Sequence, residues 1–136
     1  MKIQIDLGPG SSKWLRRSRV FGIVIKALLD ATVWIDLIYI KFHRVLPLYQ
    51  SGVRYSEEPE GQIESFDTIP AVLARGWGDC DDLGPWRVAE LRAAGEKAKI
   101  RIQWKWHQIS GQKLFHVVVR RADGTIEDPS ALLGMK

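Results

Sequence analysis

The stretch Gly76-Trp77-Gly78-Asp79-Cys80-Asp81-Asp82-Leu83 places the single cysteine of the chain where a loop passes into a helix. The two glycines permit a tight turn, and aspartates are residues that cap helix N-termini. The unpaired N–H groups and the dipole of a helix start favour the thiolate, which is the nucleophilic form of cysteine. The three flanking carboxylates oppose this effect, because nearby negative charge raises the pKa of a thiol. Cys80 is therefore either a reactive thiol or a buried structural one.

The helix that follows this stretch has two alternative starts. Apolar residues at helical spacing cover residues 82–94. Pro85 is harmless only in the first turn, because further along a helix it removes a backbone hydrogen bond. With Asp82 as the N-cap, Pro85 lies in the first turn and Cys80 falls outside the helix. With Asp79 as the N-cap, Cys80 is the first helical residue and Pro85 lies inside the helix.

Beyond this helix the hydrophobic period changes from that of a helix to that of strands. Residues 99–106 alternate between polar and apolar, and residues 114–121 form a second β-rich run. Serine and glycine at 110–111 supply a turn between them. Asp-Gly at 123–124 has hairpin-turn chemistry and leads into a third short strand at 125–127. The C-terminal part is therefore predicted to be a small antiparallel sheet.

Two side chains of this predicted sheet could act on the thiol. His116 lies within the second strand, between apolar neighbours. Such a histidine is either a packed core residue or, if the hairpin packs on the helix after Cys80, a group that faces the sulfur. Asp128 follows the third strand and precedes Pro129. It could accept the second N–H of the imidazole, or it could cap the turn at 130–133.

The N-terminal half is predicted to be mainly helical. Alternating polarity at 2–7 suggests a short strand. Apolar residues at helical spacing run from 12 to about 45, as one long helix or as two consecutive helices with a junction at 30–32. Residues 47–68 carry glycine, proline and charge without a clear period and are expected to form a loop of about twenty residues, a length that is often functional.

A short helix between Thr68 and Gly76 is expected to close this half. Helices followed by an antiparallel sheet define an α+β domain. A chain of 136 residues suits one domain, with a strand and helical region at 1–60 ahead of the sheet-bearing part at 65–135.

Composition excludes several classes of protein. With 46% hydrophobic and 26% charged residues, the chain is not disordered, collagen-like or a coiled coil. A single cysteine excludes an internal disulfide and a cysteine-rich zinc site. Neither His43 nor His107 has partners at a metal-ligand spacing, and Gly8-Pro9-Gly10 lacks the rest of a phosphate-binding loop. We therefore expect no metal and no cofactor.

The net charge of +4 is unevenly distributed. A basic stretch at 13–26 contains no acid, whereas residues 57–67 form an acidic run. Because no nucleic-acid-binding motif accompanies the basic stretch, we expect a solvated helix face or a contact with an assembly before nucleic acid. Charges interrupt the apolar residues 20–42, which argues against a membrane span, and the N-terminus lacks a secretory pattern. We expect a cytoplasmic protein.

The order of these motifs resembles the transglutaminase-like superfamily of cysteine enzymes. Gly-Asp-Cys-Asp-Asp-Leu opens a helix, Phe-His-Val-Val-Val lies in a strand, and Glu-Asp-Pro ends the next strand. The resemblance covers roughly residues 65–135. The stretches Arg-Gly-Trp-Gly-Asp-Cys, Trp-Arg-Val-Ala-Glu-Leu-Arg and His-Val-Val-Val-Arg-Arg-Ala-Asp-Gly are similar to those of small bacteriophage or prophage members. This implies a papain-like core, with the cysteine helix packed on a sheet that bears the histidine and the aspartate, and it favours Asp79 as the N-cap.

By this resemblance Cys80 is the nucleophile, His116 the general base and acid, and Asp128 the carboxylate that orients the imidazole. The implied reaction is attack on an amide or ester of a protein or peptide, through a thioester that water or an amine resolves. Trp77 and Trp104 are candidates for the walls of a substrate groove, with core packing as the alternative for each.

A non-enzymatic role is the alternative to this function. The same fold would then be a component of a phage particle or another protein assembly, in contact through the N-terminal helical region. The two roles are compatible, since a virion can carry an enzyme. The resemblance places the chain in the cytoplasm of a bacterial host or on the virion.

Overall fold

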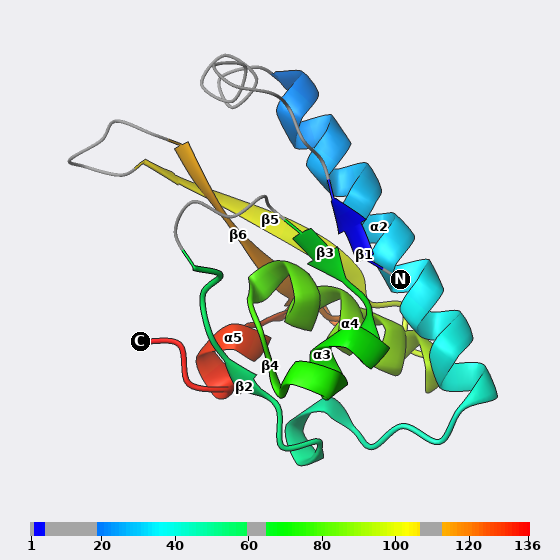
Figure 1. Cartoon of the computed structure of the whole chain (residues 1–136). Helices are drawn as coiled ribbons and strands as arrows, with labels where there is room; N and C mark the ends of the chain where they lie inside the picture. The colour runs from blue at the N-terminus through cyan, green and yellow to red at the C-terminus, as the bar shows by residue number, and fades with distance from the viewer. Residues whose placement is uncertain (1, 5–18, 60–64, 107–112) are drawn as a thin grey trace.

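The computed structural model describes residues 2–4, 19–59, 65–106 and 113–136, which form a mixed α+β structure (Figure 1). Helices and small sheets alternate along the chain. In the described residues no helix combines the length and the hydropathy that crossing a bilayer requires. The predicted α+β class is confirmed at this level.

The longest element is helix α2 (Arg19–Phe42), which runs along one side of the molecule (Figure 1). Its buried side chains recur every three or four residues, as in Phe21, Ile25, Leu29 and Val33. The helix continues through 30–32, so a junction there is wrong. The predicted start near residue 12 lies outside the described residues.

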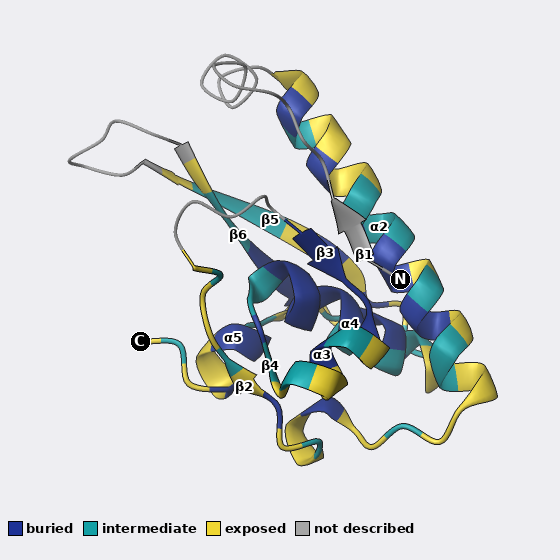
Figure 2. Ribbon diagram, in the orientation of Figure 1, coloured by how far each residue is buried: buried dark blue, intermediate teal, exposed yellow. Residues whose placement is uncertain are grey.

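Helix α4 (Cys80–Ala93) is mostly buried and packs against α2 and the largest sheet (Figure 2). Gly84 brings it close to that sheet, because a Cβ at this position would lie 2.7 Å from Cγ1 of Val117. Two core clusters meet on α4. One contains Val88 and side chains of α2 and the sheet, and the other contains Leu83 and Trp86.

The largest sheet has the predicted antiparallel hairpin. Strand β5 (Lys99–Trp106) pairs with β6 (Lys113–Arg120), and β6 pairs with the short β7 (Ile126–Glu127). The register places Trp104 opposite Phe115 and Gln103 opposite His116. The turn predicted at 110–111 lies outside the described residues. The turn at 123–124 is closed by a hydrogen bond from the Arg121 N–H to the Thr125 carbonyl.

The segment predicted as a loop at 47–68 contains three short elements instead. These are a 3-10 helix η1 (Leu48–Gln50), strand β2 (Arg54–Tyr55) and strand β3 (Ser65–Asp67). β3 pairs with β1 (Lys2–Gln4), the described part of the strand predicted at 2–7. β2 runs parallel to β4 (Trp77–Gly78). Their partners lie far away in the sequence, and strands this short carry no readable alternation.

Two short helices complete the described structure. Helix α3 (Ile69–Arg75) has Thr68 as its N-cap and ends at Gly76, whose φ of 81° is the left-handed conformation that glycine adopts readily. Helix α5 (Pro129–Leu132) follows β7 and packs against α4. The predicted limits of α3 are confirmed.

Candidate active site

Cys80 is the first residue of α4, and Asp79 is the N-cap. This confirms the second of the two predicted geometries. The backbone N–H of Asp79 donates to the Asp82 carboxylate at 3.3 Å, which closes the first turn. Cys80 is half-buried and packs against the core cluster that includes Val117, the residue after His116. Pro85 lies inside the helix.

His116 and Asp128 contact each other directly. Nε2 of His116 lies 2.8 Å from Oδ2 of Asp128, and both side chains are largely shielded from solvent. The other oxygen of Asp128 accepts the Ala131 N–H at 3.2 Å and thereby caps α5. Both alternatives for Asp128 therefore hold at once. With Nε2–H donated to the carboxylate, Nδ1 is the ring nitrogen available to take a proton.

Tyr55 lies at the same end of the molecule and was not predicted from the sequence. Tyr55 pairs with Gly78 in the β2–β4 ladder, and Gly78 lies two residues before Cys80. Its backbone N–H donates to the Leu133 carbonyl at 3.0 Å, just beyond α5. Tyr55 therefore connects the segment leading to the thiol with the helix that Asp128 caps.

The electrostatics of Tyr55 support this placement. Burial, followed by the charges of Glu57, Cys80, Asp79 and Asp128, raises the pKa of its phenol to about 12. The fields of the sulfur and of the Asp128 carboxylate thus act on one half-buried side chain. Together with the backbone contacts of Tyr55 to Gly78 and Leu133, this places Tyr55 between the segment that leads into Cys80 and the end of α5.

The two tryptophans lie in different surroundings. Trp77 is half-buried in β4, and the Arg75 guanidinium stacks over its ring at 4.2 Å from the centroid. The Trp104 ring lies 6.1 Å from that of Phe21 and 5.9 Å from that of Phe115. Since side chains alternate along β6, Phe115 and its partner Trp104 project from the face opposite to His116. Substrate binding by either tryptophan stays a prediction.

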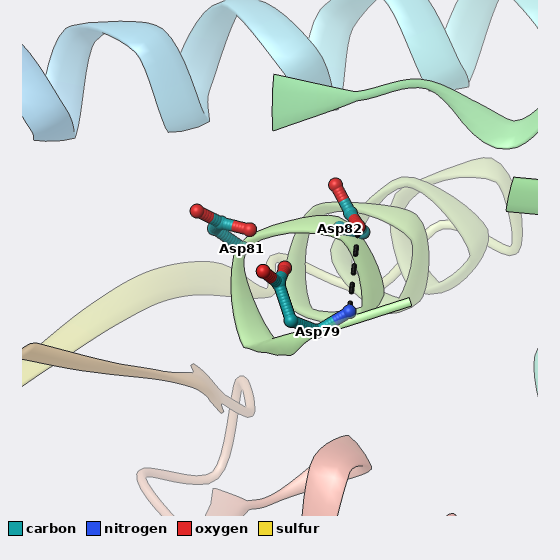
Figure 3. Close-up of side chains that lie close together, drawn as sticks. All are labelled: Asp79, Asp81 and Asp82. Carbon is teal, nitrogen blue, oxygen red and sulfur yellow. Dashed lines mark hydrogen bonds between the residues drawn. The ribbon is translucent and has the colours of Figure 1, made fainter. Parts of the chain in front are cut away.

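Three carboxylates gather at the start of α4, on the side that faces α2 and β3 (Figure 3). One side-chain oxygen from each of Asp79, Asp81 and Asp82 lies within 4.8 Å of the other two, and Asp81 and Asp82 are buried. Burial chiefly raises the pKa of Asp81, and its hydrogen bond with Asp79 adds to this. The raised pKa of Asp81 favours its protonated form and so lowers the negative charge beside Cys80.

Asp82 is tied to an arginine. The Arg75 guanidinium contacts Asp82 at 2.5 Å and also pairs with Asp67, while the Asp67 backbone N–H donates to Asp82 at 2.8 Å. Burial, followed by the charge of Asp79, raises the pKa of Asp82 to about 9, although the Asp67 N–H and Arg75 lower it. The negative charge of Asp82 is therefore either removed by protonation or balanced by the Arg75 guanidinium. The opposition to a thiolate that the sequence suggested is reduced accordingly.

This arrangement has the parts needed for proton transfer from a thiol. The sulfur lies at a helix start, where backbone N–H groups favour negative charge. The imidazole is fixed by a carboxylate that is itself held by a helix cap. Comparison with protein-family models, with curated proteins and with solved structures gives no match. The elements and sheets described above define the chain as a mixed α+β protein.

Proposed function

We propose that the chain is a cysteine-dependent acyl-transfer enzyme of the transglutaminase-like type, with a papain-like core and the triad Cys80, His116 and Asp128. One observation carries the proposal: the His116 imidazole is held at 2.8 Å by Asp128, which caps α5, and the backbone of Tyr55 joins α5 to the segment that leads into Cys80. A carboxylate that orients an imidazole near a helix-start thiol is the usual machinery of thiol activation.

In the proposed reaction, the thiol of Cys80 gives its proton to Nδ1 of His116. The thiolate attacks the carbonyl carbon of an amide or ester, and the backbone N–H of Cys80 donates to the developing oxyanion. The imidazolium then protonates the leaving amine or alcohol as the carbon–nitrogen or carbon–oxygen bond breaks, which leaves a thioester. Asp128 keeps Nε2–H directed toward itself and stabilises the imidazolium.

The thioester is resolved by a second nucleophile. His116 removes a proton from water or from an amine, the new bond forms at the carbonyl carbon, and the sulfur leaves as thiolate. Water gives hydrolysis and an amine gives transfer. The proposed substrate is a protein or peptide, whose amides supply the acyl group.

The test is the rate at which a thiol-directed probe such as iodoacetamide labels Cys80 at neutral pH. We expect faster labelling than for a small free thiol, and His116→Ala should slow it roughly 10-fold or more. His43→Ala is the matched control, because His43 is exposed and its ring stacks on Tyr39 at the end of α2. Equal rates for the wild type and His116→Ala would refute the activated pair.

A structural role in a phage particle or another assembly is the second candidate. The exposed apolar side chains of α2, including Ile23 and Trp34, favour it, since such surfaces make interfaces. The protein would then act in a bacterial host or on the virion. Normal assembly with Cys80→Ala would support a structural role alone, whereas defective assembly of this variant would support a catalytic one.

A further inference from the structure

Helix α2 is apolar on the side turned away from the core as well as on the side that packs into it. Exposed residues recur along this helix (Figure 2). The exposed fraction is 68% for Ile23, 59% for Trp34 and 56% for Ile38. A helix that is apolar all round is normally covered on every side. Arg92 of α4 borders this side, with its guanidinium 6.0 Å from the centroid of the Trp34 ring, and the described elements still leave Ile23, Trp34 and Ile38 more than half exposed.

The outward residues form a regular row, which we name the outer stripe: Val20, Val24, Ala27, Ala31, Trp34 and Ile38. Their spacing alternates between four and three residues, which is the pattern of a coiled-coil seam. At 3.6 residues per turn, the stripe is centred roughly half a turn from buried Leu29. It is therefore a second seam, independent of the seam that packs on α4.

From this seam we propose that α2 pairs with α2 of a second copy of the chain, antiparallel and about a two-fold axis. The inference goes beyond the proposed enzymatic activity and does not depend on it. With the axis near Leu29, Ala27 lies opposite Ala31 of the second copy at the centre of the pair. Small residues there let the two helices approach closely. Towards each end, a valine meets a larger side chain, since Val24 faces Trp34 and Val20 faces Ile38.

The charges on α2 suit this pairing. Lys26 and Asp30 form an ion pair at 2.6 Å beside the centre of the stripe. The two-fold axis places the Lys26–Asp30 pair of one copy beside the Lys26–Asp30 pair of the second copy. Each copy therefore presents one positive and one negative charge to the other. Arg19 and Lys41 stand at the ends of the helix, where solvent screens them.

The size of the surface also fits a second copy. At roughly 100 Å² each, the four large side chains of the stripe together with Ile23 and Phe42 offer on the order of 600 Å², the lower end of the ~600–1,000 Å² that each partner contributes to a specific interface. A membrane surface is the competing occupant. Asp30 beside the stripe and the two alanines at its centre disfavour it, because membrane-surface helices carry basic flanks and bulky apolar residues.

Sedimentation of the full chain between 1 and 100 µM tests the pairing. We expect a monomer–dimer equilibrium that Ala27→Glu weakens at least 10-fold, with helical content unchanged. Leu132→Glu is the matched control, because Leu132 is an exposed leucine of α5, away from the stripe. A monomer throughout the range, or equal weakening by both variants, would overturn the proposal.

Disulfide trapping tests the antiparallel orientation by a second route. In a Cys80→Ser background, a mixture of Ala27→Cys and Ala31→Cys chains should cross-link faster than either variant alone. Faster cross-linking of each variant with itself would indicate parallel helices and contradict the two-fold arrangement. Binding of the monomer to vesicles of phosphatidylcholine and phosphatidylglycerol without self-association would also contradict it, in favour of a membrane surface.

Discussion

Nε2 of His116 and Oδ2 of Asp128 lie 2.8 Å apart, and the second oxygen of the same carboxylate accepts the Ala131 N–H. One side chain thus fixes an imidazole and caps a helix. The cap holds the carboxylate in place, so the imidazole is oriented by a group that is itself restrained. A substitution of Asp128 should therefore affect both the reactivity of Cys80 and the stability of the fold.

Replacing Asp128 with alanine should slow labelling of Cys80 roughly 10-fold, because His116 loses the group that orients it. Loss of the helix cap should also cost about 1 kcal/mol in the free energy of unfolding. Asp123→Ala is the control for a lost local carboxylate, since Asp123 accepts hydrogen bonds from Thr125 alone in the described structure. An equal effect of both variants on labelling would contradict orientation by Asp128.

Gly84 should tolerate no larger residue, because α4 lies too close to β6. A Cβ there would meet Cγ1 of Val117 at 2.7 Å, so Gly84→Ala should lower the free energy of unfolding by about 1–3 kcal/mol despite the better helix propensity of alanine. Urea denaturation measures this. Gly22→Ala, whose Cβ would lie 3.3 Å from the edge of the Trp104 ring, should be near neutral. In a Val117→Ala background, the additional substitution Gly84→Ala should cost much less free energy of unfolding. An unchanged cost in that background would disprove the clash.

The parts of the fold predicted from sequence are those with strong local signals. Asp79 and Gly76 mark helix ends by their own chemistry, and β5 and β6 are long enough for alternation to be readable. The residues of the candidate site also lie in or next to elements with a local sequence signal. Cys80 begins α4, His116 lies within β6, and Asp128 is the N-cap of α5. The expected contact between His116 and Asp128 is confirmed by the structure.

The parts not predicted depend on partners far away in the sequence. β3 is three residues long and is defined by its pairing with β1, and β2 by its pairing with β4. The sequence places Asp67 in an acidic run, yet its side chain is buried and pairs with Arg75. No local pattern distinguishes a solvated carboxylate from a buried one that pairs with a half-buried cation.

Arg75 should be essential for the stability of this buried pairing. Arg75→Met leaves Asp67 and Asp82 without their cation and should lower the free energy of unfolding by about 3 kcal/mol near pH 7. Arg75→Lys should cost less, about 1–2 kcal/mol, since it keeps the charge but loses the fork of donors. Denaturant titrations measure both. Arg54→Met, at an exposed position of β2, is the control, and a loss as large there would argue against a special role of Arg75.

Asp36 should make the stability of the protein depend on pH. Burial raises its pKa to about 7, although the Ile69 N–H donates to it at 2.9 Å and lowers it. The unfolded chain releases this proton near pH 4, and the folded chain only near pH 7. The contribution of Asp36 to the free energy of unfolding is therefore full below pH 4 and declines as the pH rises to about 7.

Asp36→Asn should remove this decline, because asparagine keeps the acceptor for the Ile69 N–H and does not ionise. The variant should gain about 4 kcal/mol relative to the wild type between pH 4 and pH 7. Thermal or urea unfolding across this range measures the slope. Asp30→Asn, which removes a carboxylate paired with Lys26 on the same helix, is the control for the loss of a carboxylate from α2. Parallel pH profiles for wild type and Asp36→Asn would show that Asp36 ionises normally in the folded state.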